Sequence, residues 1–332
     1  MARRAFRSLG GIVAQARTVK RRAIQSTAAW SPRQIGALLT TSPLANLSAT
    51  RDLLNEFGLA TKHRLGQNFL VDNHVIEHIM ELAALTGAEH VLEVGPGIGT
   101  LSLALVQEAA HVTAIEMDSE LEPVLHAHEI DHPNFRYIMG DALKVPLERV
   151  VEVGGSEPTM LVANLPYNVA ATIILEFFEH MPSLTTAVVM VQKEVADRIA
   201  AQPGTKAYGA YTVKLSLYGE VTGRFEVPPR CFMPAPHVDS AVVRIDRVDA
   251  LADAPAPDTV AQVVEAAFAQ RRKTIRNSMS ANGFDKELLD RAFAAAGVAP
   301  TARAETLSRD TFLALTRALG EQEGHQGGAE CE

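Results

Sequence analysis

The chain has few cysteines and no long apolar run. Its only cysteines, Cys231 and Cys331, lie far apart in the sequence, which argues against a disulfide framework and indicates no thiolate metal site. No uninterrupted apolar stretch approaches the roughly 20 residues that a membrane-spanning helix needs. These absences predict a soluble protein of a reducing compartment, with no metal and no membrane partner.

A surplus of positive charge is also missing. The formal net charge is −8, and residues 1–50 hold eight Arg and Lys but no Asp or Glu, so the remainder carries −16. Proteins that bind nucleic-acid phosphates normally show a basic surplus, so any RNA contact must come from a local patch. One cluster of basic residues could be such a patch, namely Arg271, Arg272, Lys273 and Arg276. A solvated helix end explains this cluster equally well.

Residues 1–50 lack both acids and a sustained apolar period, which predicts a disordered or extraneous extension outside the fold. Their composition is similar to that of a mitochondrial transit peptide, and an overextended start or a disordered bacterial tail fits it as well. Beyond Arg51 the pattern changes. Asp72 and Asn73 can cap an amphipathic helix that Gly87 can end, with an apolar face of Ile76, Ile79, Met80 and Ala83.

Short β-rich runs then alternate with helical patterns, which predicts βαβ units and a doubly wound, mostly parallel α/β sheet. Two later runs, 221–227 and 238–245, follow each other without a helix-length spacer and predict an antiparallel hairpin at the sheet edge. Together these elements define a catalytic domain over 51–247. The expected parallel strands are 91–94, 112–115, 135–139, 160–163 and 187–191.

A smaller all-helical domain is predicted over 248–320. It begins with a linker rich in Ala, Asp and Pro at 249–257. Three helical patterns follow, one around Val260, one over 288–296 and one around Phe312 that Ser308 can cap. Residues 321–332 are polar and contain glycine, which predicts a disordered tail.

The sharpest local motif is a glycine-rich loop between a strand and a helix, Glu93-Val94-Gly95-Pro96-Gly97-Ile98-Gly99. Glycines at such a turn let the backbone approach a ligand closely. The loop alone suits NAD, FAD or S-adenosylmethionine about equally.

Three acidic residues decide between these ligands. Glu93 lies inside a strand, where a carboxylate is costly unless it serves a cationic ligand or fixes the loop. Glu116 ends the second strand and can accept both ribose hydroxyl protons, and Asp141 ends the third, where it can accept the protons of an adenine amine. A dinucleotide would instead place its pyrophosphate at the helix N-terminus, so the acids predict S-adenosylmethionine.

The segment Asn164-Leu165-Pro166-Tyr167-Asn168 follows the fourth strand. An adenine amine is a poor nucleophile because its lone pair is delocalised into the ring. Acceptors that bind its two hydrogens can aim the lone pair at a methyl group, and the Asn164 side chain and the Leu165 or Pro166 carbonyl are such acceptors. Pro166 stiffens the turn and Tyr167 can stack on the base.

With these motifs the chain resembles the ribosomal RNA adenine dimethyltransferases. The resemblance covers roughly residues 60–320 and rests on motifs in a specific order. They are Arg64-Leu65-Gly66-Gln67-Asn68-Phe69-Leu70, the glycine loop, the Asn164 segment, Phe232-Met233-Pro234-Ala235-Pro236-His237-Val238-Asp239-Ser240-Ala241, and Arg303-Ala304-Glu305-Thr306-Leu307-Ser308.

The resemblance implies a class I methyltransferase fold with a helical, RNA-binding C-terminal domain. It implies that Phe232 faces Tyr167 across a flipped base, completing a catalytic set with Asn164, Leu165 and Pro166. The expected S-adenosylmethionine site consists of Asn68, Leu70, Gly95, Gly97, Glu116, Asp141 and Asn164.

The pattern is most similar to the bacterial branch that dimethylates two adjacent adenosines near the 3′ end of small-subunit (16S) RNA. This implies an immature 30S particle as partner, a monomeric enzyme and a cytoplasmic location, or the mitochondrial matrix if residues 1–50 are a transit peptide. Two alternatives stay open. One is a resistance methyltransferase acting on large-subunit RNA, and the other is an RNA chaperone or transcription factor on the same fold.

Overall fold

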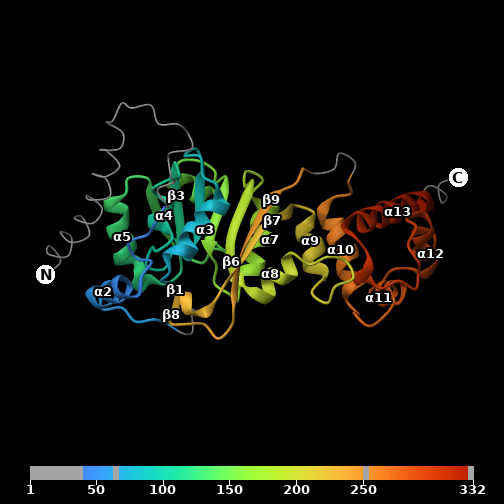
Figure 1. Cartoon of the computed structure of the whole chain (residues 1–332). Helices are drawn as coiled ribbons and strands as arrows, with labels where there is room; N and C mark the ends of the chain where they lie inside the picture. The colour runs from blue at the N-terminus through green and yellow to red at the C-terminus, as the bar shows by residue number, and fades with distance from the viewer. Residues whose placement is uncertain (1–39, 63–66, 250–253, 328–332) are drawn as a thin grey trace, which may run out of the picture. The chain divides into compact units, whose positions relative to one another are not determined.

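The computed structural model describes residues 40–62, 67–249 and 254–327. Seven strands form one sheet in the order β4-β3-β2-β5-β6-β9-β7. Figure 1 labels β3, β6, β7 and β9 of this sheet. The strands β2, β3 and β4 pair in parallel, whereas β9 pairs antiparallel with β6. The predicted α/β fold with an antiparallel edge is therefore confirmed. The strands are β2 His90–Val94, β3 His111–Glu116, β4 Phe135–Met139, β5 Met160–Asn164, β6 Thr186–Gln192, β7 Gly219–Val227 and β9 Ser240–Arg247.

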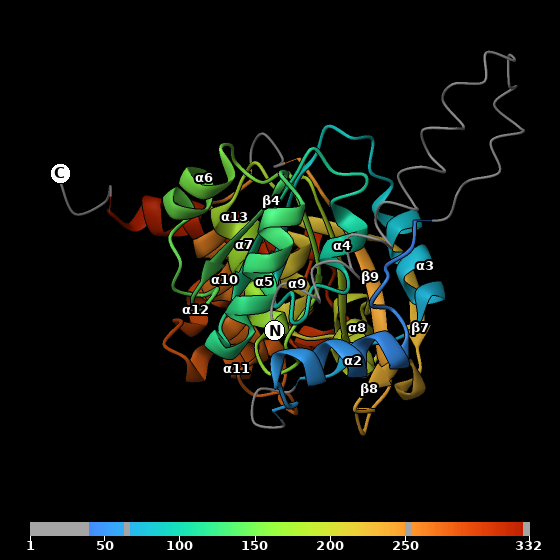
Figure 2. The same ribbon diagram turned by 90° about the vertical axis from the view of Figure 1, so that its left-hand side faces the viewer.

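Helices follow the strands as the alternating pattern predicts. The helices α5 and α6 both contact the edge strand β4 (Figure 2). Every residue of β2 is buried, which matches the continuous apolar runs typical of parallel strands covered on both faces. The helices associated with the sheet are α4 Ser102–Leu105, α5 Glu122–Asp131, α6 Leu147–Gly154, α7 Ala170–His180, α8 Lys193–Ile199 and α9 Ala210–Ser216.

The chain divides into two compact units. The first runs to Pro158 and also contains Val162–Pro166 and Val227–His237, and the second contains Thr159–Leu161, Tyr167–Glu226 and the chain from Val238 onward. The second unit thus groups the edge strands with the C-terminal helices. The predicted catalytic domain over 51–247 and helical domain over 248–320 stay a prediction.

The fold begins earlier than the predicted boundary at Arg51. The helix α2 (Leu47–Phe57) is capped by Asn46 and ends at Gly58, which adopts φ 64°. Its Leu53 packs in a cluster with Leu44, Ile98 and Val124. Residues 40–50 therefore belong to the fold, because their apolar side chains have a core to enter. The rest of the predicted extension, residues 1–39, lies outside the described residues.

A second, two-stranded sheet is antiparallel and separate from the main one. Its strands are β1 (Phe69–Leu70) and β8 (Phe232–Met233), with Phe69 opposite Met233 and Leu70 opposite Phe232. Two-residue strands carry no periodicity, so no pattern in the sequence indicates this pairing. The predicted helix after Asp72 is α3 (Asn73–Ala83), and it ends at Ala84 in a left-handed conformation rather than at Gly87.

The C-terminal helices share one core. Val264 of α10, Phe293 of α12 and Phe312 of α13 are buried together, and Tyr208 joins the same cluster. The sequence prediction omitted α11, a seven-residue helix whose N-cap is Thr274. The predicted disordered tail is also wrong at its start, since α13 continues through Gly327. The bounds are α10 Pro257–Phe268, α11 Ile275–Ala281, α12 Lys286–Ala295 and α13 Arg309–Gly327.

No helix in the described ranges is long and apolar enough to cross a membrane.

Candidate active site

The glycine loop after β2 is held by tight packing within the first unit. Gly95 and Gly97 adopt φ 69° and 59°, a left-handed region that glycine occupies without steric cost. A Cβ at Gly95 would lie 3.6 Å from ring carbons of Pro166, and one at Gly97 would lie 3.1 Å from the Phe69 ring. The loop therefore contacts both the turn after β5 and the strand β1.

Glu116, at the end of β3, is bonded directly to this loop. One carboxylate oxygen accepts the Gly97 N–H at 3.1 Å and the other accepts the Asp118 N–H at 2.8 Å. The side chain is buried, and burial raises its pKa while those two backbone bonds oppose the shift. The predicted ribose acceptor thus stands beside the predicted loop.

Glu93 lies beneath the loop in a fully enclosed position. Its carboxyl accepts the Ser102 hydroxyl at 2.5 Å, and Ser102 is the first residue of α4. Burial, with a smaller contribution from the charge of Glu116, raises the pKa of Glu93 to about 8. The sequence left two roles for Glu93, which were to bind a cationic ligand or to fix the loop. The hydrogen bond from Ser102 supports the second role, because it ties the loop to the following helix.

Asp141 is the third predicted acid and follows β4. Its neighbour Gly140 donates its N–H to the Glu116 carbonyl at 2.8 Å, so the two acidic strand ends are adjacent. The Asp141 carboxylate pairs with Lys144 at 3.1 Å and accepts the Leu143 N–H at 3.1 Å. The hydrogen bond from Lys144 is the main reason that the pKa of Asp141 lies below its ordinary value.

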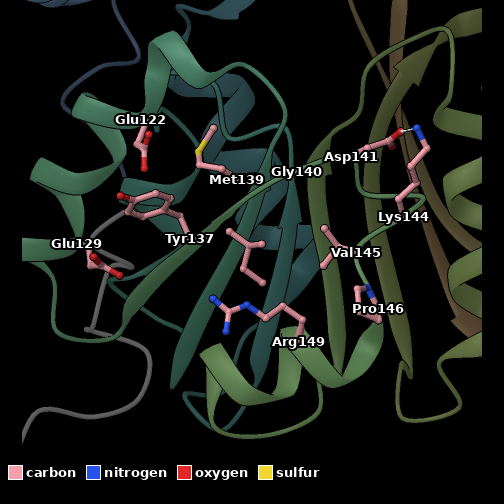
Figure 3. Close-up of a pocket in the computed structure, with 11 residues that line it drawn as sticks. Glu122, Glu129, Tyr137, Met139, Gly140, Asp141, Lys144, Val145, Pro146 and Arg149 are labelled. Carbon is pink, nitrogen blue, oxygen red and sulfur yellow. Dashed lines mark ion pairs between the residues drawn. The ribbon is translucent and has the colours of Figure 1, made fainter.

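An open pocket of about 660 Å³ extends from Asp141 along the edge strand β4. Figure 3 shows the pair of Asp141 and Lys144 at one end and Tyr137 between Glu122 and Glu129 at the other. Burial, followed by the two glutamates, raises the pKa of Tyr137. The lining of this pocket combines five charged side chains with apolar ones, and Asp141 is its one residue that belongs to the predicted cofactor site.

The turn after β5 lies against Asn68, which directly precedes β1. The Asn164 amide nitrogen faces the Asn68 carbonyl at 3.5 Å, which leaves the Asn164 oxygen available as an acceptor. Leu165 is buried. Leu70 is paired with Phe232 across the two-stranded sheet. The first unit therefore joins these residues, through Phe69 and Pro166, to the glycine loop.

Tyr167 belongs to the second unit and Phe232 to the first, so the aromatic sandwich stays a prediction. The Tyr167 hydroxyl is bonded to the Ser240 hydroxyl at 2.6 Å, and Ser240 is fully buried. Burial raises the pKa of this tyrosine. The bond to Ser240 fixes the orientation of the Tyr167 ring. The Tyr167 hydroxyl therefore has a role in addition to the stacking expected of the ring.

Two residues that support the site were missed from the sequence. Asp118 accepts hydrogen bonds from Lys62 at 2.6 Å and Gln67 at 2.7 Å. His128 of α5 bonds the Ile98 carbonyl at 2.9 Å from beneath the glycine loop. The spacing of Glu116 and Asp118 hinted at a paired function for the two acids, whereas no local signal connects His128 to a loop about 30 residues earlier.

Three of the four residues of the predicted basic patch lie in the loop between α10 and α11. Arg271, Arg272 and Lys273 are exposed there, and Arg271 donates to the carbonyl of Lys206, another exposed cation that the sequence prediction omitted. None of these four forms an ion pair with any described residue.

Arg276 differs from the rest of the predicted patch. It lies on α11 and forms two hydrogen bonds of 2.6 Å with the carboxylate of Asp290. A paired guanidinium adds less to a phosphate-binding field than a free one, because its charge is already compensated. The uncompensated charge therefore lies in the loop and at Lys206.

His74 and His78 lie four residues apart on α3, a spacing at which two histidines can bind one metal ion. His74 instead lies 3.2 Å from Glu77. Within the described ranges, no group of three or more His, Cys, Asp or Glu residues could hold a metal ion.

The chain matches known proteins over most of its length. The family model for ribosomal RNA adenine dimethylase matches residues 58–320. The chain belongs to this family. A protein of Bacillus mycoides described as ribosomal RNA small subunit methyltransferase A is 39% identical over 283 residues, covering 83% of this chain and 97% of the relative. A Bacillus anthracis protein of the same description is equally similar.

Two solved structures share the dimethylase fold. A dimethyladenosine transferase of Plasmodium falciparum matches with TM-score 0.66 and 24% identity, covering 77% of this chain and 98% of its own. The 23S rRNA methyltransferase ErmE matches with TM-score 0.60 and 28% identity, covering 76% of this chain and all of its own. The match over 58–320 includes α10 to α12, so the helical segment belongs to the dimethylase pattern and is no unrelated addition.

Proposed function

We propose that this dimethylase uses S-adenosylmethionine to dimethylate N6 of two adjacent adenosines near the 3′ end of small-subunit ribosomal RNA. The observation that carries the proposal is the convergence within one unit of the glycine loop, Glu116 and the Asn164 turn. The curated relatives described as small-subunit methyltransferases match nearly end to end, which supports the choice of substrate.

The residues present fit S-adenosylmethionine better than a dinucleotide. The Glu116 carboxylate lies beside the glycine loop and accepts the Gly97 N–H, so it would repel a pyrophosphate placed there. The helix that follows the loop, α4, has only four residues, so its dipole offers little to an anion. We expect Glu116 to bind the ribose hydroxyls, Asp141 the adenine amine, and Asn68, Leu70, Gly95 and Gly97 the remainder.

The chemistry assigned to the Asn164 turn follows from its acceptors. S-adenosylmethionine, when bound, supplies an electrophilic methyl group. The Asn164 oxygen and the Leu165 or Pro166 carbonyl would accept the two hydrogens of the target amine and orient its lone pair. Pairing of the Asn164 nitrogen with the Asn68 carbonyl sets which end of the amide faces outward. Tyr167 and Phe232 would hold the flipped base by stacking.

RNA binding is assigned to the loop between α10 and α11. Arg271, Arg272, Lys273 and the adjoining Lys206 provide local positive charge in a chain whose net charge is −8. With so few phosphate contacts, the protein should prefer a structured immature 30S particle over free RNA. We therefore propose a cytoplasmic location, where an immature 30S particle would be found.

The likeness to ErmE keeps large-subunit RNA as the second candidate substrate. Its identity, 28% against 39%, and the share of this chain that it covers, 76% against 83%, are lower than those of the Bacillus mycoides relative. A binding-only role has less support, since a chaperone needs no amine acceptors after β5.

The deciding experiment is single-turnover methyl transfer to immature 30S particles and to large-subunit RNA, with saturating cofactor and mass spectrometry of the adenosines. Asn164→Ala should lower the rate at least ~10²-fold, as loss of a preorganised polar group does. Asn134→Ala is the matched control, because that amide donates only to the Val106 and Ala109 carbonyls. It should reduce stability and leave the rate nearly unchanged.

Full activity in Asn164→Ala would refute the mechanism. Methylation of large-subunit RNA alone would replace the proposed substrate, and no methylation of either RNA by the unaltered protein would favour the binding-only role.

A further inference from the structure

Asp118 is a nearly enclosed carboxylate with three separate partners. One of its oxygens lies 2.6 Å from the Lys62 ammonium and 3.2 Å from the Glu120 N–H, and the other accepts the Gln67 amide at 2.7 Å. Gln67 in turn accepts the Lys62 backbone N–H at 2.9 Å. Burial alone would raise the pKa of Asp118, but the bonds from Lys62 and Gln67 outweigh it and lower the pKa. The carboxylate therefore stays charged at neutral pH.

These contacts connect two parts of the cofactor site that are distant in sequence. On one side, the Asp118 N–H donates to Glu116, the expected ribose ligand. On the other side, Gln67 directly precedes Asn68, whose carbonyl faces the Asn164 amide. Phe69, the next residue, is the side chain that a Cβ at Gly97 would meet.

We propose that Asp118 is a positioning residue that holds Lys62 and Gln67, and through them the Asn68–Leu70 backbone, against the glycine loop and the Asn164 turn. The inference rests on the proposed function, because the cofactor is what that backbone would contact. Asp118 does not touch the reacting atoms. Its effect should therefore appear in cofactor affinity and not in the rate of methyl transfer.

Two simpler roles must be separated from this one. Asp118 caps the short 3-10 helix η2 (Ser119–Leu121), and its bridge to Lys62 could be an ordinary surface ion pair of little consequence. Asp118→Asn tests the first, since asparagine caps as well as aspartate does but carries no charge for Lys62. The low exposure of both partners, 16% for Lys62 and 6% for Asp118, argues against the second.

The experiment compares Asp118→Asn, Lys62→Met and the double variant by calorimetric titration with S-adenosylmethionine and by steady-state kinetics. Loss of a charged hydrogen-bond partner should raise the Kd and KM about 10-fold, with kcat at saturating cofactor within about threefold of the unaltered protein. Lys62→Met also removes the 3.0 Å pair between Lys62 and Glu120. The double variant should therefore lose no more than Lys62→Met alone and less than the two single losses combined, because both changes break the contact between Lys62 and Asp118. The matched control is Lys214→Met, since Lys214 pairs with Glu265 at 2.7 Å and is 23% exposed. It should bind cofactor normally.

Amide hydrogen exchange without cofactor provides a second readout. In the unaltered protein the Val71 N–H donates to the Cys231 carbonyl at 2.8 Å, so the peptide covering 67–71 should be protected. Asp118→Asn should speed exchange there and leave the strand β6 unchanged.

An unchanged Kd together with unchanged exchange would overturn the positioning role. A fall in kcat at saturating cofactor, with no change in the Kd for S-adenosylmethionine, would overturn it as well. If the unaltered protein binds no S-adenosylmethionine, the proposed function fails. The exchange measurement still decides whether Asp118 holds this segment.

Discussion

Alanine at Gly99 should damage the loop through a clash that can be traced to one side chain. Gly99 adopts φ 86°, and an added Cβ would lie 2.6 Å from both Cδ2 and Nε2 of His128. His128 cannot turn away freely, because it is 5% exposed and its Nε2 is bonded to the Ile98 carbonyl at 2.9 Å. Burial is the main cause that lowers the pKa of this histidine, so the neutral ring donates that bond.

The expected magnitude has two parts. Forcing alanine into the left-handed region costs about 1–2 kcal/mol, and overpacking a filled site costs about 1–3 kcal/mol more. Gly99→Ala should therefore lower the free energy of unfolding by about 2–5 kcal/mol. Gly155 supplies the matched control, since it has φ 82° and no atom within 4 Å of an added Cβ. Gly155→Ala should cost only the first part.

The assay is urea denaturation of both variants together with calorimetric titration of S-adenosylmethionine. Displacement of the His128 ring would also move Ile98, so Gly99→Ala should weaken cofactor binding and Gly155→Ala should not. Adding His128→Ala to Gly99→Ala should cost less than the two single losses combined, because the smaller side chain removes the clash. Equal stability losses at Gly99 and Gly155 would refute the packing argument.

The remaining predictions concern protonation, orientation and charge. Glu93 has a folded pKa of about 8, above its unfolded value, so the unfolded chain binds fewer protons. The free energy of unfolding should fall by roughly 1.4 kcal/mol per pH unit between about pH 4.5 and 8, and Glu93→Gln should flatten that fall in urea titrations. Tyr167→Phe should cost about 1–2 kcal/mol of stability by leaving the buried Ser240 hydroxyl unpaired, whereas no loss would show that the bond is unimportant. Changing the cations of the patch to Glu should weaken binding to 30S intermediates and flatten its salt dependence; these cations are Arg271, Arg272, Lys273 and Lys206. The control Lys286→Glu, at an exposed position, should have little effect. If the patch variant kept the salt slope of the unaltered protein, the patch would be excluded from RNA binding.

The chemistry-bearing motifs could be predicted because their signals are local. The glycine loop, Glu116 and Asp141 each follow a buried apolar run, and parallel strands bring their carboxyl ends to one edge of a sheet. Knowing the strand order was unnecessary for that inference. The same reasoning located the turn at Asn164, which is the last residue of β5.

Errors arose where a local pattern was too short or was ambiguous. Two-residue strands such as β1 have no detectable period, and seven-residue α11 is too short to show a clear apolar face. Gly87 was predicted to end α3, but Ala84 adopts the left-handed conformation three residues earlier. The prediction from composition that residues 40–50 lie outside the fold was also wrong. The absence of acidic residues does not reveal that Leu44 packs in a hydrophobic core.

What each carboxylate binds was decided only by the tertiary structure. Sequence identified Glu93 as costly in a strand and left two explanations, and the hydrogen bond from Ser102 supports one of them. Asp118 went unnoticed because its partners lie more than 50 residues earlier in the chain. Hydrogen bonds and ion pairs depend on distances of a few tenths of an ångström, and only folding brings such distant side chains within that range.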